Sequence, residues 1–311
     1  MKTKVYIDGQ SGTTGLQIYD RIGAREDLEL MRIDEDKRHD PDERRKYINA
    51  ADIVFLCLPD DGAREAVGLI ESDHVRVIDA STAHRTAEGW VYGFPELSKG
   101  QRAAIAGARF VANPGCHATG LISTVAPLVR MGILPADYPV TCFSLTGYTG
   151  GGKKMIAQYE GENRDRKLDS PGIYGLNQKH KHIPEMMKYT GLTHKPVFLP
   201  VVDDFAQGMA STVELQSRLL TGHPGAEEVR DRLAGYYAGE TFVRVAPFEE
   251  KPGTLYANAF AGTNDLEIHV CGDDESITVT SLFDNLGKGA SGAAVQNMNI
   301  MLGLPETTGL R

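Results

Sequence analysis

The sequence predicts an α/β protein with two domains, one built on a parallel sheet and a second, α+β domain whose sheet is largely antiparallel. About the first 110 residues alternate short apolar runs with helical segments. Beyond about residue 140, strand-like runs follow one another with few helices between them. At 311 residues, the chain is also longer than one average domain.

Five apolar runs mark the strands of the expected parallel sheet. They are residues 4–8, 28–33, 52–58, 75–80 and 109–112. Near-continuous apolar runs between helical segments are typical of strands that are covered on both faces. Because ligands bind at the carboxyl ends of such strands, the loops at 9–15, 81–85 and 113–116 are expected to carry the function.

Six later runs are expected to form the largely antiparallel sheet. They are residues 140–148, 195–202, 208–220, 241–247, 265–272 and 276–284. One helical segment, 225–239, interrupts them, and a small, apolar helical segment at 289–305 is expected to return to the first domain. The predicted domains are 1–116 with 286–311, and 117–285.

The charge balance argues against nucleic acid as a partner. Lys and Arg number 33 against 42 Asp and Glu, the net charge is −9, and the chain has no basic run. The amino terminus leads directly into a strand-like segment, and no apolar run approaches the roughly 20 residues that span a bilayer. We therefore expect a cytoplasmic protein with no membrane partner.

The four cysteines are scattered, without a C-x-x-C pair, so neither a disulfide framework nor a zinc ribbon is predicted. Cys57, Cys142 and Cys271 lie in or beside strand patterns and are expected to be structural. Cys116 differs, because it follows an Asn-Pro-Gly turn at the start of a helical segment. Unpaired N–H groups and the positive end of the helix dipole favour a thiolate at such a position.

Gly9, Gly12 and Gly15 stand in G-x-x-G-x-x-G spacing between a predicted strand and a predicted helix. Glycines there permit a tight turn and let backbone N–H groups approach a pyrophosphate. The pattern favours a Rossmann-type nucleotide-binding loop, and the alternative is a tight turn without a ligand.

The end of the second apolar run leaves the choice of nucleotide open. Asp34 favours NAD, because an acid there accepts hydrogen bonds from the ribose hydroxyls. Lys37 and Arg38 favour NADP, because a cation there binds the extra phosphate. A solvated charged loop is the third interpretation.

A histidine cluster lies further along the chain. His180 and His182 are two residues apart, with Glu185 three beyond and Tyr174 six before His180. Imidazole titrates near neutrality, so a histidine beside Cys116 can generate the thiolate and move the substrate's protons. A metal site and a pair of surface histidines are the alternatives, and the segment offers too few ligands for the first.

Seven motifs give the chain a resemblance to the N-acetyl-gamma-glutamyl-phosphate reductases of the shorter type. They are GQSGTTG (9–15), STAHR (81–85), YGFPEL (92–97), NPGCHATG (113–120), TGYTGGGKK (146–154), HKHIPE (180–185) and FDNLGKGASGAAVQNMN (283–299). They occur in the family's order and cover essentially the whole chain. The NPGC and DNLGKGA blocks are specific to this family and its relatives, the aspartate-semialdehyde and glyceraldehyde-phosphate dehydrogenases.

The resemblance implies an activity, the NADPH-dependent reduction of N-acetyl-gamma-glutamyl phosphate to N-acetyl-glutamate 5-semialdehyde in arginine biosynthesis. The reaction would pass through a thioester on the protein. The resemblance implies that Cys116 is the nucleophile and His180 the general base, with His182, Glu185 and Tyr174 around them.

The resemblance also implies NADP as cofactor and a small-molecule substrate. The few candidate ligands predict no metal, and long exposed strands in the catalytic domain predict a homodimer or homotetramer. The NADP-binding domain would be 1–116 with 286–311, and the catalytic and oligomerisation domain 117–285. The residues expected to contact the cofactor are Gly9, Ser11, Gly12, Thr13, Thr14, Gly15, Arg38, Ser81, Asn285, Lys288 and Gly289. The residues expected to contact the substrate are Arg85, Asn113, Thr146, Gly147, Lys153 and Lys154.

Two positions depart from the family's pattern. His84 stands where the family commonly has phenylalanine, and Gln207 stands where many members have arginine. If that arginine holds the anionic substrate, its role passes to Arg85, Lys153 or Lys154 here.

Three functions therefore compete. The first is the reductase described above, and the second is a related acyl-phosphate reductase of the aspartate-semialdehyde dehydrogenase type. The third is a non-catalytic NADP-binding protein, against which the intact Cys116 and His180 argue.

Overall fold

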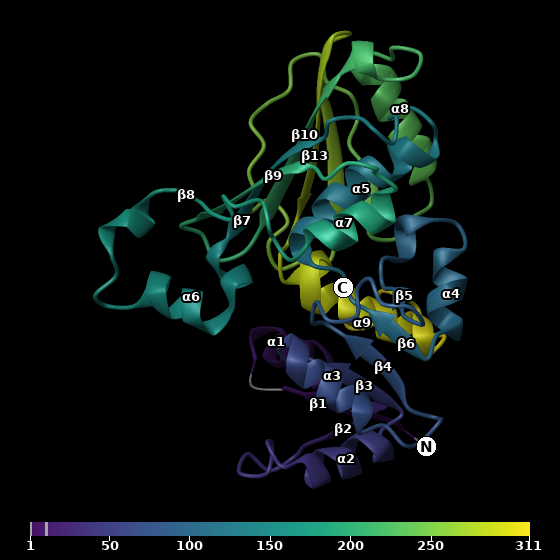
Figure 1. Ribbon diagram of the computed structural model, residues 1–311, viewed down its shortest axis with the longest axis vertical. Helices are drawn as coiled ribbons and strands as arrows, with labels where there is room; N and C mark the ends of the chain where they lie inside the picture. Colours follow the sequence, from purple (N-terminus) through teal and green to yellow (C-terminus); the bar gives the residue numbers. More distant parts are fainter. Residues whose placement is uncertain (1, 10–11) are drawn as a thin grey trace. The chain divides into compact units, whose positions relative to one another are not determined.

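The computed structural model describes residues 2–9 and 12–311 and divides the chain into two compact units (Figure 1). The first unit comprises Met1–Gly115 with Ala290–Arg311, and the second comprises Cys116–Gly289. The sheet of the first unit is wholly parallel, and that of the second is mostly antiparallel. The predicted fold class is confirmed.

The sheet of the first unit has the strand order β2-β1-β3-β4-β6-β5. Its strands are β1 (Thr3–Asp8), β2 (Leu28–Met31), β3 (Ile53–Leu56), β4 (Arg76–Asp79), β5 (Val91–Tyr92) and β6 (Phe110–Ala112). Five of them coincide with the predicted apolar runs, whereas β5 has two residues and is too short to show a pattern. The strand order reverses between β1 and β3, which is where open parallel sheets bind their ligands.

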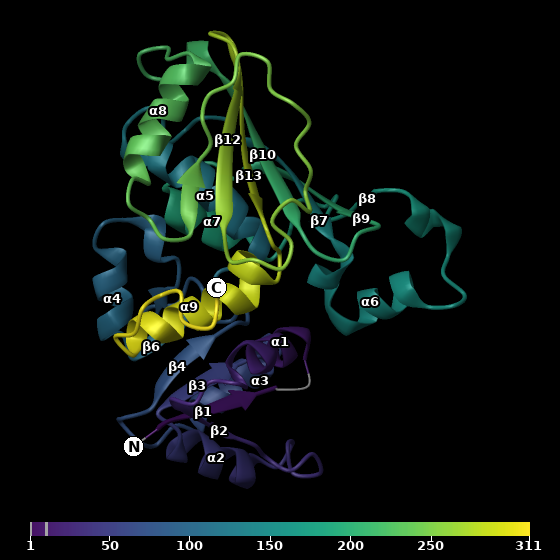
Figure 2. The same ribbon diagram turned by 180° about the vertical axis from the view of Figure 1, so that it is seen from behind.

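The helices of the first unit are α1 (Thr13–Ile22), α2 (Pro41–Ala50), α3 (Asp60–Gly68), α4 (Gln101–Gly107) and α9 (Gly292–Met301). Helix α2 begins where the side chain of Asp40 accepts hydrogen bonds from two N–H groups of the first turn. Residues of α2 and α3 share one core cluster with strand residues such as Tyr6, Val54 and Val77. Helix α9, yellow in both views, contacts α1, α4 and β4 (Figures 1 and 2).

The sheet of the second unit has the strand order β11-β12-β13-β10-β7-β9-β8. Its strands are β7 (Thr141–Gly147), β8 (Gly172–Ile173), β9 (Val197–Asp203), β10 (Met209–Gln216), β11 (Val243–Val245), β12 (Leu266–Gly272) and β13 (Ser276–Phe283). All but the two-residue β8 lie in or overlap the predicted runs. Two of the neighbouring pairs, β11 with β12 and β7 with β9, are parallel.

The helices of the second unit are α5 (Cys116–Arg130), α6 (Gly152–Glu160), α7 (Ile183–Thr190) and α8 (Ala226–Tyr236). Helices α5 and α8 pack on the sheet and α7 packs on α5, so all three lie on one side of it (Figures 1 and 2). Helix α6 was not predicted, because it follows three glycines, which normally interrupt a helix. Within the described residues, no helix combines the length and apolar character needed to cross a lipid bilayer.

Close packing holds α5 against β10. A Cβ placed on Gly120 of α5 would stand 2.3 Å from Oγ and 2.5 Å from Cβ of Ser211 on β10. Both distances are far below van der Waals contact, so the helix reaches this depth only because residue 120 has no side chain. The approach positions the whole of α5, including its first residues.

We predict that Gly120→Ala lowers the free energy of unfolding by about 1–3 kcal/mol, because the new methyl group forces α5 away from β10. Gly235→Ala is the matched control: it lies within α8, where an added Cβ would meet nothing within 4 Å. That change should be neutral or stabilise by up to about 1 kcal/mol. Urea titration followed by circular dichroism measures both, and equal effects would contradict the packing argument.

Candidate active site and nucleotide cavity

Cys116 is the first residue of α5 and is half-buried. Gly289 lies directly against it, since a Cβ on Gly289 would stand 2.8 Å from the Cβ of Cys116. Burial raises the pKa of the Cys57 and Cys142 thiols far above the usual range. Cys116 instead lies at a helix start, where N–H groups and the helix dipole favour a negative charge.

His117, the second residue of α5, is almost fully buried and hydrogen-bonded at both ring nitrogens. Its Nδ1 lies 2.7 Å from Oγ of Ser144, and its Nε2 lies 2.7 Å from the hydroxyl of Tyr174. Oγ of Ser144 in turn lies 2.6 Å from Oγ of Ser211. Burial lowers the pKa of His117 to about 3, and the nearby His180 adds to the effect. His117 is therefore neutral at physiological pH.

Tyr174 follows β8, and its N–H donates to the carbonyl of Pro200. Burial raises the pKa of its phenol, and the charge of the Cys116 thiolate raises it further. The phenol therefore stays protonated at physiological pH.

His180 is half-buried and lies beside two other imidazoles. Its ring centroid is 5.5 Å from that of His117 and 4.7 Å from that of His182, in both cases nearly perpendicular. The Nδ1 of His180 accepts a hydrogen bond of 3.2 Å from the backbone N–H of His182. A neutral His180 therefore carries its proton on Nε2.

His182 and Glu185 are both buried at the start of α7. They are three residues apart, so they lie on the same face of this helix. Burial raises the pKa of Tyr189 to about 12, and the charge of Glu185 contributes to that shift. The structure thus brings the predicted histidine cluster together with the amino end of α5.

Asn285 and Lys288, both predicted to contact the cofactor, have partners within the second unit. Oδ1 of Asn285 accepts from the N–H of Gly208 at 2.8 Å, and its Nδ2 donates to Oγ1 of Thr149 at 3.0 Å. Lys288 is 1% exposed, and its ammonium lies 5.8 Å from the ring centre of Phe242. These contacts hold residues 285–288, which lead to Gly289 beside Cys116.

The substrate residues predicted in the second unit lie on two elements. Thr146 and Gly147 end β7, and the Thr146 hydroxyl donates to the carbonyl of Gly147. Lys153 and Lys154 are exposed on α6. Gln207, at the position where many family members have arginine, is half-buried in the loop between β9 and β10.

In the first unit, a cavity of about 400 Å³ opens where β1 and β3 end. Its described lining residues are Tyr6, Ile7, Asp8, Gly9, Gly12, Ile33, Arg38, His39, Arg44, Cys57, Leu58, Pro59, Gly62 and Glu65. Gly9 has φ +87°, and a Cβ there would stand 2.3 Å from the carbonyl oxygen of Cys57. Only glycine fits this turn. Ser11, predicted to contact the cofactor, lies outside the described residues.

Helix α1 begins beside this cavity. Gly12 precedes it, and no side chain caps its first turn, which holds Thr13, Thr14 and Gly15. The hydroxyl oxygen of Thr13 is buried and makes no hydrogen bond within the described residues. Uncapped N–H groups and an unsatisfied buried hydroxyl are the features of a site that binds an anion such as a pyrophosphate.

The loop after β2 contributes Arg38 and His39 to the described lining of the cavity. Arg38 forms an ion pair with Glu35. Asp34 is on the surface, where it pairs with Lys37 at 3.3 Å, and it is absent from that lining. The loop therefore presents the guanidinium of Arg38 to the cavity.

A buried ion pair forms the wall of the cavity. Nε and Nη2 of Arg44 lie 3.1 and 2.9 Å from Oδ2 of Asp8. Burial raises the pKa of Asp8, and Arg44 opposes that shift. Sequence reasoning missed this pair. An acid such as Asp8 at the end of an apolar strand indicates a buried carboxylate, and a buried carboxylate needs a cation beside it.

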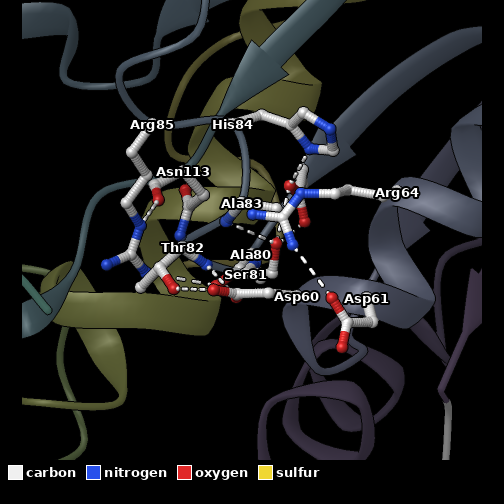
Figure 3. Close-up of polar contacts among 11 residues, drawn as sticks. Asp60, Asp61, Arg64, Ala80, Ser81, Thr82, Ala83, His84, Arg85 and Asn113 are labelled. Carbon is white, nitrogen blue, oxygen red and sulfur yellow. Dashed lines mark hydrogen bonds and ion pairs between the residues drawn. The ribbon is translucent and has the colours of Figure 1, made fainter.

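The loop after β4, in which Figure 3 labels Ser81 and His84, is held by the buried Asp79. The N–H and hydroxyl of Ser81 each lie 2.8 Å from an oxygen of Asp79, and Nδ1 of His84 lies 2.6 Å from Oδ2. The His84 ring also stacks on Trp90, with 4.2 Å between ring centres. These two contacts hold the His84 ring at the position where the resemblance implied phenylalanine.

Arg85 and Asn113, both predicted to contact the substrate, are bound to each other in the first unit (Figure 3). Nε of Arg85 donates to the carbonyl of Asn113 at 3.0 Å, and Nη2 donates to the carbonyl of Ala80 at 3.2 Å. The Asn113 side chain accepts from Asn297 and donates to the carbonyl of Ala290. Arg85 thus links the ends of β4 and β6.

Sequence reasoning also missed His117 and Ser144. The sequence signal for His117 was its position directly after Cys116. It forms no spaced motif with a second polar residue, so the sequence did not indicate a role for it. Ser144 is one of several hydroxyls in a strand, and only the fold shows that it faces α5. Across the described residues, no group of three or more His, Cys, Asp or Glu side chains is arranged to hold a metal ion.

Two sequence models of one protein family match the chain. The semialdehyde dehydrogenase NAD binding domain matches residues 4–107, and the semialdehyde dehydrogenase dimerisation domain matches residues 116–285. The chain is 52% identical to N-acetyl-gamma-glutamyl-phosphate reductase 2 of Nostoc sp., over 99% of each chain. It is 50% identical to N-acetyl-gamma-glutamyl-phosphate reductase of Brucella anthropi, over 97% of this chain and 99% of that one.

Among the solved structures that share this fold are aspartate semialdehyde dehydrogenases. The enzyme from Francisella tularensis superposes with a TM-score of 0.71 at 15% identity, over 96% of this chain and 100% of that one. Aspartate semialdehyde dehydrogenase II from Vibrio cholerae gives 0.68 at 16% identity, over 97% and 98%. At these identities the likeness concerns the fold alone.

Proposed function

This chain belongs to the N-acetyl-gamma-glutamyl-phosphate reductase family, and we propose that it reduces N-acetyl-gamma-glutamyl phosphate to N-acetyl-glutamate 5-semialdehyde with NADPH. The reaction would serve arginine biosynthesis in the cytoplasm, which fits four cysteines that are all free thiols. The observation that carries the proposal is a half-buried cysteine at a helix start, beside a group of histidines and a protonated tyrosine.

Cys116 supplies the nucleophile. Its thiolate attacks the acyl carbon of the substrate, the bond from that carbon to the phosphate oxygen breaks, and inorganic phosphate leaves. The product of this step is a thioester on Cys116. Backbone N–H groups at the start of α5 stabilise the tetrahedral oxyanion, and such donors contribute about 3 kcal/mol each in other enzymes.

His180 handles the protons. A neutral His180 presents its Nε2 proton, because its Nδ1 accepts the N–H of His182. In this form the Nε2–H donates a hydrogen bond to the oxyanion of the thiohemiacetal and keeps its proton. To act as general base toward the Cys116 thiol, the ring would instead present a bare Nε2, and the proton received there would pass to the departing phosphate. Collapse of the thiohemiacetal releases the aldehyde and returns the sulfur to its starting state.

The cavity of the first unit fits a nicotinamide dinucleotide. The N–H groups that begin α1 and the Thr13 hydroxyl would hold its pyrophosphate, with Gly9 and Gly12 allowing close approach. Arg38 would bind the 2′-phosphate, so we assign NADP as the cofactor. When bound, the cofactor supplies the hydride that reduces the thioester. Gly15, Ser81, Asn285, Lys288 and Gly289 stay predicted cofactor residues.

The anionic groups of the substrate need cations. Lys153 and Lys154 are exposed on α6 and offer two mobile ammonium groups. Arg85 and Asn113 offer an ordered polar pair in the first unit. We propose that these residues, with Thr146 and Gly147, take the role of the arginine that Gln207 replaces.

We also propose a homodimer or homotetramer that assembles through the sheet of the second unit. Ser144 faces α5, so the neighbouring Phe143 points to the opposite side of the sheet, where it is exposed. Leu199 is its register partner on β9, and Val197 lies two residues before on the same side; both are exposed. An exposed apolar face of this kind is typical of a subunit interface.

We predict that Cys116→Ser lowers the reductase rate by roughly 100-fold or more but leaves NADPH binding unchanged, because the alcohol is far less ionised than the thiol. The matched control is Cys271→Ser, a half-buried thiol on β12, which should retain activity. The assay follows NADP reduction with N-acetyl-glutamate semialdehyde and phosphate, with aspartate semialdehyde in parallel. A preference for aspartate semialdehyde would reassign the substrate, and an active Cys116→Ser would remove the nucleophile.

We predict that Arg38→Ala weakens NADPH binding by about 10-fold and leaves NADH binding nearly unchanged, because the lost contact is to the 2′-phosphate. Lys37→Ala is the matched control, since Lys37 pairs with Asp34 on the surface. Fluorescence titration with each nucleotide measures both variants. If Lys37→Ala had the larger effect, the phosphate would bind outside the described cavity.

We predict that Phe143→Glu shifts the protein toward monomers, because a carboxylate would be buried at the interface. Tyr256→Glu is the control, a change at an exposed aromatic residue that lies outside the strands of the sheet. Sedimentation equilibrium reports the mass of each variant. An unchanged assembly in Phe143→Glu would place the interface elsewhere.

A further inference from the structure

A chain of hydrogen bonds leads from the interior of the second unit to the candidate active site. It runs from Ser211 to Ser144, from Ser144 to Nδ1 of His117, and from Nε2 of His117 to Tyr174. Ser144, Ser211 and His117 are buried, so each of their polar hydrogens needs a partner within the protein. We call these four residues the relay.

Counting donors gives the relay a direction. A neutral imidazole has one donor and one acceptor, and each hydroxyl has one hydrogen. If Tyr174 donated to His117, the hydrogens would all point inward and the Ser211 hydroxyl would need a further acceptor. Within the described residues, Oγ of Ser211 is hydrogen-bonded to Ser144 alone. A buried hydroxyl without an acceptor costs about 1–3 kcal/mol, so the outward direction is favoured.

In the outward direction every buried donor is used. Ser211 donates to Ser144, Ser144 donates to Nδ1 of His117, and the Nε2–H of His117 donates to the oxygen of Tyr174. The hydrogen of the Tyr174 hydroxyl is then not used in the bond to His117, and it can point toward the candidate active site. His117 directly follows Cys116 in the first turn of α5 and lies 2.7 Å from the phenol, so the Tyr174 hydroxyl lies beside the turn that carries the sulfur.

We propose that His117 is a positioning residue that holds its proton on Nε2 and thereby makes Tyr174 a hydrogen-bond donor to the sulfur of Cys116 and to the oxyanions formed on it. The inference rests on the proposed role of Cys116 as the nucleophile. It adds a second source of stabilisation for negative charge beside the N–H groups of α5. It also assigns a function to a histidine whose buried ring never gains a proton.

The surroundings of His117 agree with a neutral ring. The ionisable groups facing it are Tyr174 from the segment after β8, and His180 and His182 from the segment before α7. Phe198 of β9 also contacts its face. No carboxylate among the described residues is hydrogen-bonded to it, so nothing compensates a positive charge there.

The first test reads the tautomer of His117 directly in the intact protein. Nitrogen-15 chemical shifts of an imidazole distinguish Nε2–H from Nδ1–H, and His117→Gln identifies the signal. We expect the Nε2–H form from pH 6 to pH 8, within the range where imidazole normally titrates. An Nδ1–H form, or a ring that gains a proton in this range, would overturn the direction of the relay.

The second test measures the thiol of Cys116 by its rate of alkylation with iodoacetamide at a series of pH values. Tyr174→Phe should raise the thiol pKa by about one unit, because a charge-assisted hydrogen bond is lost. His117→Phe should raise the thiol pKa by a similar amount. His117→Gln should raise it less, because the glutamine amide can still donate to Tyr174. The double variant of His117→Phe and Tyr174→Phe should be no worse than Tyr174→Phe alone.

Tyr236→Phe is the matched control. Tyr236 accepts a hydrogen bond from Arg130, the last residue of α5, at the opposite end of this helix from Cys116. Its loss should leave the thiol pKa unchanged. Circular dichroism checks that each variant folds, and if His117→Phe does not, Tyr174→Phe and the tautomer measurement still decide.

The outcomes separate the inference from the proposed function. An unchanged thiol pKa in Tyr174→Phe, or additive effects in the double variant, would overturn the inference even if Cys116→Ser showed that the reductase reaction depends on the thiol. Conversely, a wild-type protein that reduced no acyl phosphate would refute the proposed function, whereas the alkylation and tautomer data would still report the relay.

Discussion

Close packing of α5 against the sheet of the second unit is the constraint on which the candidate active site depends. Because Gly120 has no side chain, the helix approaches β10 so closely that Ser211 occupies the place where a Cβ would stand. The same contact orders two members of the relay, because Ser211 begins it and the first turn of α5 carries His117 next to Cys116. The position of the thiol is therefore set by a backbone distance deep in the interior, where packing is dense and little can shift.

The two units use different electrostatics for different ligands. The cavity of the first unit is bordered by full charges, including Arg38 and the buried pair of Asp8 and Arg44. Such charges suit a polyanionic nucleotide that has to be held at a fixed place. The second unit places neutral groups beside Cys116, namely the buried imidazole of His117 and the phenol of Tyr174, both of which resist ionisation. A neutral but polar environment stabilises charge only where it develops, which is what a covalent intermediate requires.

The sequence predicted the fold class and most strands, because apolar runs and their alternation with helical segments are local properties. It did not show β5 and β8, which are too short, or α6, which follows a run of glycines. The predicted site residues were those with a motif, such as Cys116 and His180. His117, Ser144 and Asp8 were missed because their partners come from distant strands and helices, and only the fold brings those partners together.

The contact between Gly120 and Ser211 also limits how this protein can diverge. A side chain can appear at position 120 only if the residue at 211 becomes smaller at the same time, since a Cβ and the hydroxyl would be 2.3 Å apart. Alanine at 211 would keep its Cβ 2.5 Å from the new one, so only glycine makes room. Glycine removes the first donor of the relay, and Ser144 then loses its hydrogen-bond partner on β10. Sequence changes at positions 120 and 211 are therefore coupled. A relative with a larger residue at 120 would need another way to fix the tautomer and orientation of the imidazole of His117, or another residue in its place.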